Sequence, residues 1–199
     1  MNKIYVPKMS ESFGKTPQAL VSHYLWLNNG YRPRVAVFLA YDGGGLYVEF
    51  GVDEPPAQTR YNGDGQAVYK DSAVEMFLRP FAADARYVNF EFNRAGFLLM
   101  GFGESRDGRA ELSGVYKSRL NVRAYASQTD WRLSFEIPFD VLSGLYGKEF
   151  RPKDGAAANF YKCGDETPTP HYGAVFKVRG KTPDFHLSRY FGDLVFLDS

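Results

Sequence analysis

Strict alternation of apolar and polar residues is the feature that most restricts the fold of this chain. The segment LYVEFGVDE, residues 46–54, has an apolar side chain at every second position, and so do YVNFEFN, residues 87–93, and WRLSFEIPF, residues 131–139. A period of two is typical of strands that bury one face and expose the other. The sequence therefore predicts several half-buried strands.

Further strands are predicted where apolar residues cluster between turn signals such as YDGGG and NRAG. They cover residues 34–41, the second half of 68–81 with Val74, Met76 and Leu78 on one face, 95–103, 117–126, 156–163 and 192–197. Only PFDVLSGLYG, residues 138–147, has a helical pattern, which ends at Gly147. Many closely spaced strands with almost no helix between them indicate an all-β fold. We expect one domain over residues 1–199, an antiparallel β-sandwich of the immunoglobulin-like or jelly-roll-like kind.

The segment from 164 to 192 interrupts this pattern. It contains three prolines, two of the three histidines and several aromatic residues, and only GAVFKV, residues 173–178, has the composition of a short strand. Long loops in compact domains are usually functional or disordered, and the aromatic content of this one argues against disorder. We therefore expect an ordered C-terminal loop that lies against one sheet.

Charge and hydropathy exclude several classes of function. The net charge is +1 with no basic run, so we expect no nucleic-acid partner. No apolar run approaches the ~20 residues of a membrane span, so we expect no membrane partner. The N-terminal residues have no apolar signal core. We expect export to the periplasm or the medium if a signal peptide has been removed, and a cytoplasmic location otherwise. The sequence does not predict the oligomeric state.

Two carboxylates on predicted neighbouring strands are the first candidates for chemistry. If the strand that contains Glu75 pairs with the strand that contains Glu91, both lie on one face, one strand spacing of ~4.8 Å apart. Paired carboxylates about 5–5.5 Å apart serve retaining glycosidases. Glutamates on the outward face of a strand are also commonly solvated. Catalysis, ligand binding and simple exposure therefore all stay open for this pair.

The same face is expected to carry aromatic and amide side chains. Tyr69 shares the parity of Glu75 if that strand extends so far back, and Asn89 shares the parity of Glu91. A sugar presents apolar C–H faces and a rim of hydroxyl groups, which match an aromatic platform flanked by polar side chains. The alternative is an ordinary exposed sheet face.

Other motifs give weaker signals. His23, His171 and His186 lack the short spacing of a zinc site, so a structural or surface role is expected for them. Cys163 is the single cysteine, which excludes an intramolecular disulfide. We expect no cofactor. Turn carboxylates are compatible with a structural calcium ion, although no twelve-residue loop pattern assigns ligands. These carboxylates are Asp42, Asp53, Glu54, Asp64, Asp84, Asp107 and Asp154.

Taken together, these motifs resemble the family 9 carbohydrate-binding modules. The resemblance covers the chain from about Val35 to its end, and its most specific parts are the D-S-x-V-E-x-F core, residues 71–77, and the N-F-E-F-N run, residues 89–93. The C-terminal part, from NFYKCGDETPTPHYGAVF to YFGDLVF, is similar to a subgroup of stand-alone bacterial proteins. The resemblance implies a β-sandwich that binds sugars without cleaving them. Well-studied members accompany xylanases and hold the ends of glucan or xylan chains between two aromatic side chains.

The resemblance also implies roles for particular residues. The glutamate of the motif corresponds to Glu75, and the first stacking aromatic corresponds to Tyr69, where those members carry tryptophan. Polar residues on neighbouring strands correspond to Asn89 and, roughly, to Asn159. Glu91 is expected to assist.

The second stacking aromatic departs from the family pattern. Relatives in the subgroup carry tryptophan about four residues after the loop histidine, where this chain has Val175. We therefore expect Tyr172 or Phe176 to take the stacking role, and the ligand to be an oligosaccharide or a polysaccharide chain end.

Two alternatives to binding have their own structural criteria. A glycoside hydrolase would use Glu75 and Glu91, and carboxylates more than ~10 Å apart would exclude it. A protein-interaction sandwich without a small ligand would be favoured by a flat surface beside Tyr69.

Overall fold

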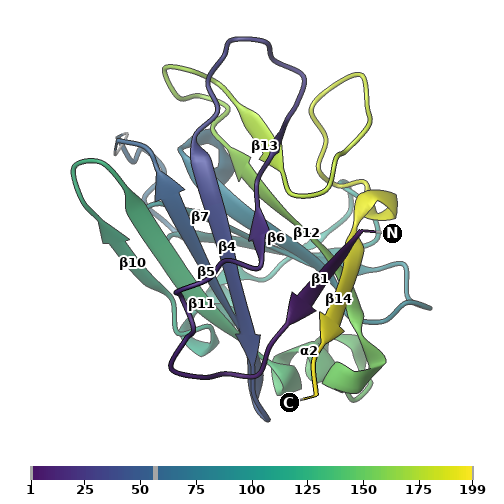
Figure 1. Cartoon of the computed structure of the whole chain (residues 1–199). Helices are drawn as coiled ribbons and strands as arrows, with labels where there is room; N and C mark the ends of the chain where they lie inside the picture. Colours follow the sequence, from purple (N-terminus) through teal and green to yellow (C-terminus); the bar gives the residue numbers. More distant parts are fainter. Residues whose placement is uncertain (1, 56–57, 199) are drawn as a thin grey trace.

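Two β-sheets packed face to face form the protein in the computed structural model, which describes residues 2–55 and 58–198 (Figure 1). The first sheet has the order β1 (Lys3–Val6), β14 (Gly192–Phe196), β12 (Ala156–Cys163), β6 (Ala73–Arg79), β7 (Tyr87–Asn93), β8 (Leu98–Gly103) and β9 (Ala110–Glu111). Outside this order, β13 (Tyr172–Ala174) pairs with β12, and β3 (His23–Tyr24) pairs with β13.

The second sheet has the order β10 (Arg123–Ala126), β11 (Trp131–Pro138), β5 (Gly45–Asp53), β4 (Arg34–Tyr41) and β2 (Ala19–Leu20). The predicted antiparallel sandwich is confirmed. Among the described strands, only β1 and β14, which lie side by side at the right of Figure 1, pair in parallel.

Helical segments are short. They are α1 (Ser113–Tyr116), α2 (Phe139–Tyr146) and the 3₁₀ turns η1 (Val68–Lys70), η2 (Lys117–Arg119), η3 (Pro152–Asp154) and η4 (Ser188–Tyr190). The predicted helix is confirmed as α2, and Gly147 ends it with a φ of 63°, a left-handed conformation that glycine adopts without steric cost.

Four predicted strands begin or end elsewhere. The strand expected over 95–103 begins only at Leu98, because the chain is still turning at Gly96, whose N–H donates to the Asn93 carbonyl oxygen at 2.9 Å. The strand expected over 117–126 is reduced to β10, because the preceding residues form η2 and bury Leu120. The strand expected over 173–178 is replaced by the shorter β13, shifted one residue toward the N-terminus. The strand expected to extend back to Tyr69 begins only at Ala73, because Tyr69 lies in η1.

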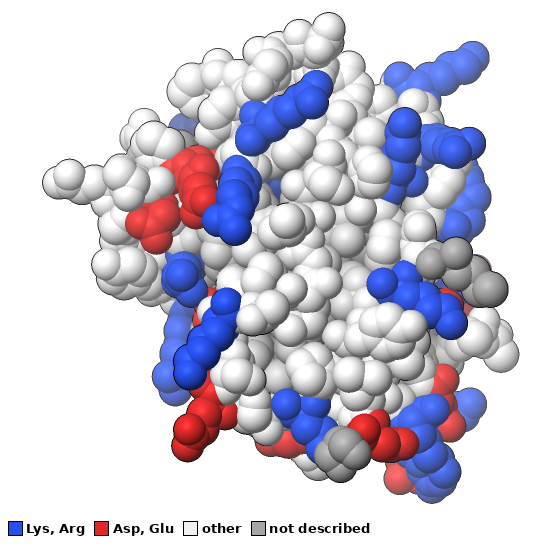
Figure 2. All heavy atoms as spheres, viewed as in Figure 1, with Lys and Arg blue, Asp and Glu red and all other residues white. Residues whose placement is uncertain are grey.

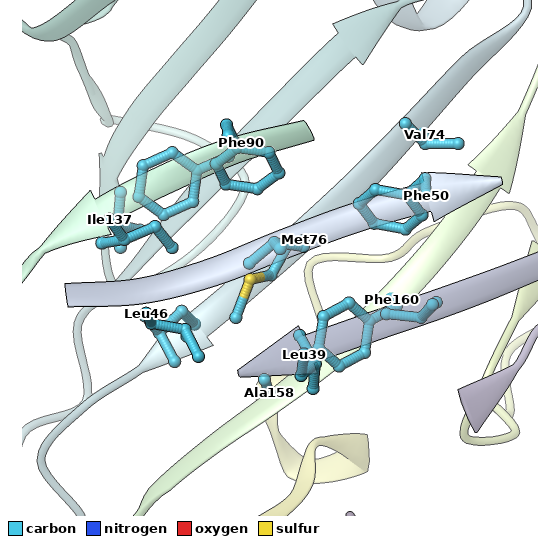
Figure 3. Packing of buried hydrophobic residues seen from close by; sticks show 14 of the residues in the cluster. Leu39, Leu46, Phe50, Val74, Met76, Phe90, Ile137, Ala158 and Phe160 are labelled. Atoms are coloured by element: carbon cyan, nitrogen blue, oxygen red, sulfur yellow. The ribbon is translucent and has the colours of Figure 1, made fainter. Parts of the chain in front are cut away.

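The inward faces of both sheets form the main hydrophobic core (Figure 3). Val74, Met76 and Leu78 of β6 alternate inward as the sequence predicts, and they meet side chains of β4, β5 and β11. Burial of these side chains is the main stabilising contribution to a fold of this kind. The residues labelled in Figure 3 are Leu39, Leu46, Phe50, Val74, Met76, Phe90, Ile137, Ala158 and Phe160.

A second, smaller apolar cluster lies on the outward face of the first sheet. There the segment 164–192 packs against β6, β7 and β12, so the predicted ordered loop against one sheet is confirmed. The ring of Phe185 stacks on that of Tyr161 with 4.1 Å between centroids, and the Tyr161 hydroxyl donates to the Phe185 carbonyl oxygen at 3.2 Å. The outward face is therefore partly roofed by the loop.

Charged side chains are distributed without strong segregation on the face drawn in Figure 2. Lys and Arg lie mainly around its edge, interspersed with Asp and Glu, and its centre is largely uncharged. Within the described ranges, no helix has the length and apolar character to span a bilayer.

Candidate functional site

A cavity of about 260 Å³ opens between the outward face of the first sheet and the long loop. Five of the seven predicted site residues line it together. They come from η1, β6, β7 and β13, which the sheet order and the fold of the loop bring side by side. The five are Tyr69, Glu75, Asn89, Glu91 and Tyr172.

The two glutamates form part of the cavity floor. Glu75 lies directly opposite Glu91 in the β6–β7 register, as the sequence predicts, and both side chains are buried. Such opposite residues have Cβ atoms about 4.5–5.5 Å apart. The Cys163 thiol donates to Glu75 Oε1 at 2.9 Å, and Asn89 Nδ2 donates to Glu91 Oε1 at 2.8 Å.

Burial controls the ionisation of this pair. Loss of solvent raises the pKa of Glu75 to about 8, although the hydrogen bond from Cys163 opposes the shift. Burial, followed by the neighbouring charge of Glu75, raises the pKa of Glu91 well above its ordinary value. Burial therefore favours the protonated form of both groups. A neutral carboxyl group can donate one hydrogen bond and accept others, which suits it to a hydroxyl partner.

Two tyrosines contribute half-buried aromatic rings to the lining. Tyr69 comes from η1 rather than from an extended β6, yet its ring still borders the cavity. Tyr172, on β13, packs edge-on against Trp26 with 5.8 Å between ring centroids. Between these segments, the backbone N–H of Asp165 donates to the Tyr69 carbonyl oxygen at 3.4 Å. Burial, despite the opposing charge of Arg106, raises the pKa of Asp165 to about 6.

The D-S-x-V-E motif combines structural and cavity-lining residues. Asp71 accepts hydrogen bonds from the backbone N–H groups of Arg60 and Tyr61 and from Asn93 Nδ2, so it fixes the chain just before β6. Ser72 donates to the buried Glu54. Only Glu75 reaches the cavity, because its parity on β6 directs it outward.

Asn159 and Phe176 do not line the cavity. Asn159 has the outward parity that the sequence predicts, but loop backbone covers it. Its Nδ2 donates to the Phe176 carbonyl oxygen at 2.9 Å, and its Oδ1 accepts from the Phe176 N–H at 3.0 Å. The Phe176 ring packs against the main core, which also buries Val175. These residues hold the loop against β12, and of the two expected second aromatics only Tyr172 borders the cavity.

Several lining residues were not predicted. Arg106 and Arg109 come from the turn region between β8 and β9, and Asp165, Asp184, Phe185 and His186 come from the long loop. The Tyr87 hydroxyl and His186 Nδ1 share a hydrogen bond of 2.9 Å, and burial lowers the pKa of His186 to about 3. For the four residues of the long loop, the only sequence signal is the density of aromatic and polar side chains there.

The turn carboxylates that the sequence suggested as calcium ligands do not gather around a common point in the described part of the chain. Across residues 2–55 and 58–198, no group of three His, Cys, Asp or Glu side chains has the arrangement of a metal site. Asp42 instead accepts from the N–H groups of Gly44 and Gly45, and Asp84 pairs with Arg86 at 2.6 Å.

Solved structures with the same fold include two kinds of neighbour. A proposed carbohydrate-binding protein from Bacteroides uniformis has 25% sequence identity and a TM-score of 0.83, over 98% of this chain and 99% of the other. A family 9 module from Caldicellulosiruptor kristjanssonii with cellotriose has 15% identity and a TM-score of 0.62, over 98% of this chain and 93% of the other.

A family 9 module from the same organism with glucose has 14% identity and a TM-score of 0.66, over 99% of this chain and 96% of the other. No curated protein has a significant sequence match to the chain. The sequence profile of carbohydrate-binding family 9 matches residues 9–196, which is nearly the whole chain. This protein therefore belongs to carbohydrate-binding family 9.

Proposed function

We propose that the protein binds an oligosaccharide or the end of a polysaccharide chain, of the glucan or xylan class, without cleaving it. The observation that carries the proposal is that Tyr69 and Tyr172 line one cavity together with Glu75, Asn89 and Glu91. Aromatic rings complement the apolar C–H faces of a sugar ring, and neutral carboxyl and amide groups complement its hydroxyl groups.

The size of the cavity supports a small ligand. Its 260 Å³ lies just below the range of about 300–1,000 Å³ for sites that hold drug-sized molecules. A terminal sugar unit fits such a volume better than an internal stretch of a chain. The ligands bound to the C. kristjanssonii modules, cellotriose and glucose, support a glucose-based unit as the first choice.

Replacing Tyr69 by alanine is expected to weaken sugar binding about fivefold to tenfold, because an aromatic platform beside the ring is lost. Isothermal titration calorimetry with glucose, galactose, xylose, cellotriose and xylotriose would measure the affinity of the wild type and the variant. Tyr125→Ala is the matched control, since Tyr125 is 63% exposed on β10 and lies outside the cavity lining. No binding of any of these sugars, or equal affinity of the Tyr69 and Tyr125 variants, would contradict the proposal.

A glycoside hydrolase is the second candidate, because Glu75 and Glu91 lie directly opposite each other. Their register satisfies the distance criterion for a carboxylate pair. Both standard mechanisms, however, need one carboxylate to be ionised while the other donates a proton. Burial raises the pKa of both groups and so disfavours the ionised carboxylate that these mechanisms need, which favours binding. Incubation with cellotriose and xylotriose, followed by product analysis, would separate the two candidates.

The cavity beside Tyr69 also weighs against a sandwich that serves only protein interaction. Such a function would be favoured by a flat surface at this position, whereas Tyr69 and Tyr172 border a hollow with buried polar groups in it. Buried polar groups in a concave site are typical of small-molecule recognition.

A further inference from the structure

Trp26 lies in an unfavourable backbone conformation. Its φ is 63°, and the turn around it is closed by the Leu27 N–H, which donates to the Leu25 carbonyl oxygen at 2.8 Å. A three-residue turn with a positive φ at its centre is rare and strained. Among the non-glycine residues of the described ranges, only Asn121 shares a positive φ, and asparagine tolerates it better than a bulky aromatic residue does. Contacts of the Trp26 side chain therefore have to offset a backbone cost.

Those contacts are made with one wall of the cavity. The Trp26 ring packs edge-on against Tyr172, with 5.8 Å between ring centroids, and at a tilt against Phe185, with 5.6 Å between centroids. Its Nε1 donates to the Gly180 carbonyl oxygen at 3.0 Å. Tyr172 and Phe185 both line the cavity, whereas Trp26 is not among the lining residues. Trp26 therefore supports wall residues without bordering the cavity itself.

The backbone next to Trp26 holds the same wall. The Leu25 N–H donates to the Tyr172 carbonyl oxygen at 2.8 Å. Immediately before Leu25, β3 pairs with β13, the strand on which Tyr172 lies. One short segment thus contacts both the backbone and the ring of Tyr172.

The two wall residues differ in how much other support they have. The Phe185 ring stacks on Tyr161 of β12 with 4.1 Å between centroids. Within the described ranges, the aromatic rings that pack against Tyr172 are those of Trp26 and, at 6.3 Å between centroids, Phe185. The orientation of the Tyr172 ring therefore depends on Trp26 more than that of Phe185 does.

The strained turn indicates that the ring at position 26 matters more than the turn. Glycine adopts a positive φ without steric cost, so the turn by itself does not require tryptophan. Strained backbone conformations persist where surrounding contacts hold them, and they cluster at ligand-binding sites. An aromatic ring that is already oriented in the free protein also binds more tightly, because less conformational freedom is lost on binding.

We propose that Trp26 is a positioning residue for sugar binding. It holds the Tyr172 ring in the orientation that stacks on the sugar, and it does not contact the sugar itself. The inference rests on the proposed sugar-binding function and on the stacking role expected for Tyr172. It extends the determinants of affinity to a segment that does not border the cavity.

Trp26→Gly tests the inference, because it removes the ring and relieves the strained turn. We expect about fivefold to tenfold weaker binding of the tightest-binding sugar among glucose, galactose, xylose, cellotriose and xylotriose, as for Tyr172→Ala. Isothermal titration calorimetry would measure the affinities. Leu27→Ala is the matched control, since this neighbouring side chain is 43% exposed and alanine keeps the N–H that closes the turn. We expect its affinity to stay within about twofold of the wild type.

A double-mutant cycle separates positioning from a general effect on the fold. If Trp26 acts through Tyr172, the double variant Trp26→Gly/Tyr172→Ala should bind within about twofold of Tyr172→Ala alone. Tyr69 makes no ring contact with Trp26 in the part of the chain that the structure describes. Trp26→Gly combined with Tyr69→Ala should therefore lower the affinity by the product of the two separate losses.

Trp26→Phe is the conservative variant. It keeps an aromatic ring against Tyr172 and should bind within about threefold of the wild type. Circular dichroism and thermal unfolding would confirm that each variant folds. If Trp26→Gly does not fold, Trp26→Asn takes its place, since asparagine also adopts a positive φ and loses less chain entropy on folding than glycine.

The outcomes separate this inference from the proposed function. Wild-type affinity of Trp26→Gly, or of Trp26→Asn in its place, would overturn the positioning role and leave the proposed function standing. So would a loss equal to that of Leu27→Ala, a loss that multiplies with that of Tyr172→Ala, or wild-type affinity of Tyr172→Ala. No binding of any of these sugars to the wild type would overturn both.

Discussion

Replacing Lys162 by methionine is expected to lower the free energy of unfolding by about 3–5 kcal/mol, because it leaves a buried carboxylate without its counter-ion. Lys162 lies fully buried on the inward face of β12, with Nζ 3.3 Å from Glu54 Oε1. Although burial favours the neutral acid, the charge of Lys162 and hydrogen bonds from neighbouring side chains hold the pKa of Glu54 below its usual value. One of these bonds comes from Trp131 Nε1 at 2.9 Å.

The same ammonium group also anchors the long loop. Lys162 Nζ donates to His171 Nε2 at 2.6 Å, and His171 directly precedes the cavity residue Tyr172. Burial, aided by the charge of Lys162, lowers the pKa of His171 to about 4, which keeps its ring neutral and able to accept this bond. Loss of Lys162 is therefore expected to loosen one wall of the cavity as well as the contact between the sheets.

Urea unfolding would measure the effect, with Arg34→Met as the control. Arg34 pairs with Asp53 at 3.1 Å, next to Glu54 in sequence, but both side chains of this pair are more than half exposed. Exposed pairs contribute about 0–1 kcal/mol. A loss of stability in Lys162→Met no larger than in Arg34→Met would show that the buried pair does not hold the sheets and loop together.

Replacing Glu75 by leucine is expected to change binding and stability in opposite senses. Sugar affinity should fall by about tenfold to a hundredfold, because ligand hydroxyl groups lose a partner in a buried site. The free protein should become more stable at pH 8, by at least about 1 kcal/mol, because a carboxyl group disfavoured by burial is removed. If Glu75 had only a structural role, its replacement would instead lower the stability of the protein.

The pH dependence gives the sign of this effect. The folded-state pKa of Glu75, about 8, lies above its ordinary value of 4.5. Between these values the folded protein keeps a proton that the unfolded chain releases, so wild-type stability falls as the pH rises through this window. Glu75→Gln removes this contribution and keeps a donor and an acceptor. Its stability advantage should be largest at pH 8 and vanish below about pH 4.5.

Chemical unfolding at pH 4.5, 6 and 8, together with calorimetry, would measure both effects. Glu75→Gln should keep more affinity than Glu75→Leu, because the glutamine amide can still donate a hydrogen bond to a ligand hydroxyl group and accept one from it. A stability advantage independent of pH, or wild-type affinity in Glu75→Leu, would contradict the account.

The sequence predicts most of the fold because the strands carry their own pattern. In β5, β7 and β11, the side chains at every second position are the ones the core buries, so the alternation alone identifies the inward face. The pairing of Glu75 with Glu91 follows from the short connection between β6 and β7. The first residue of β6, Ala73, was not predictable in this way. Hydrogen bonds from the backbone N–H groups of Arg60 and Tyr61 to Asp71 fix the chain there, and they come from a loop whose residues have no periodic pattern.

The site residues also fall into two groups, those on regular strands, which the sequence predicts, and those on turns and loops, which it does not. Glu75, Asn89 and Glu91 were predictable because strand parity places them on one face. Arg109 was not, because it reaches the cavity only through the pairing of β8 with the two-residue β9. Phe176 shows the converse. Its aromatic side chain next to Val175 suggested a stacking role, yet the turn after β13 directs its ring into the main core. Loop side chains are placed by tertiary contacts, which leave no period in the sequence.

A crystal structure of the protein with the tightest-binding sugar of the calorimetric series would test the central claim most directly. The account predicts an intact sugar in the cavity, with a ring against Tyr69 and with hydroxyl groups at Glu75 and Asn89. A sugar bound elsewhere on the surface, or cleaved in the cavity, would contradict it.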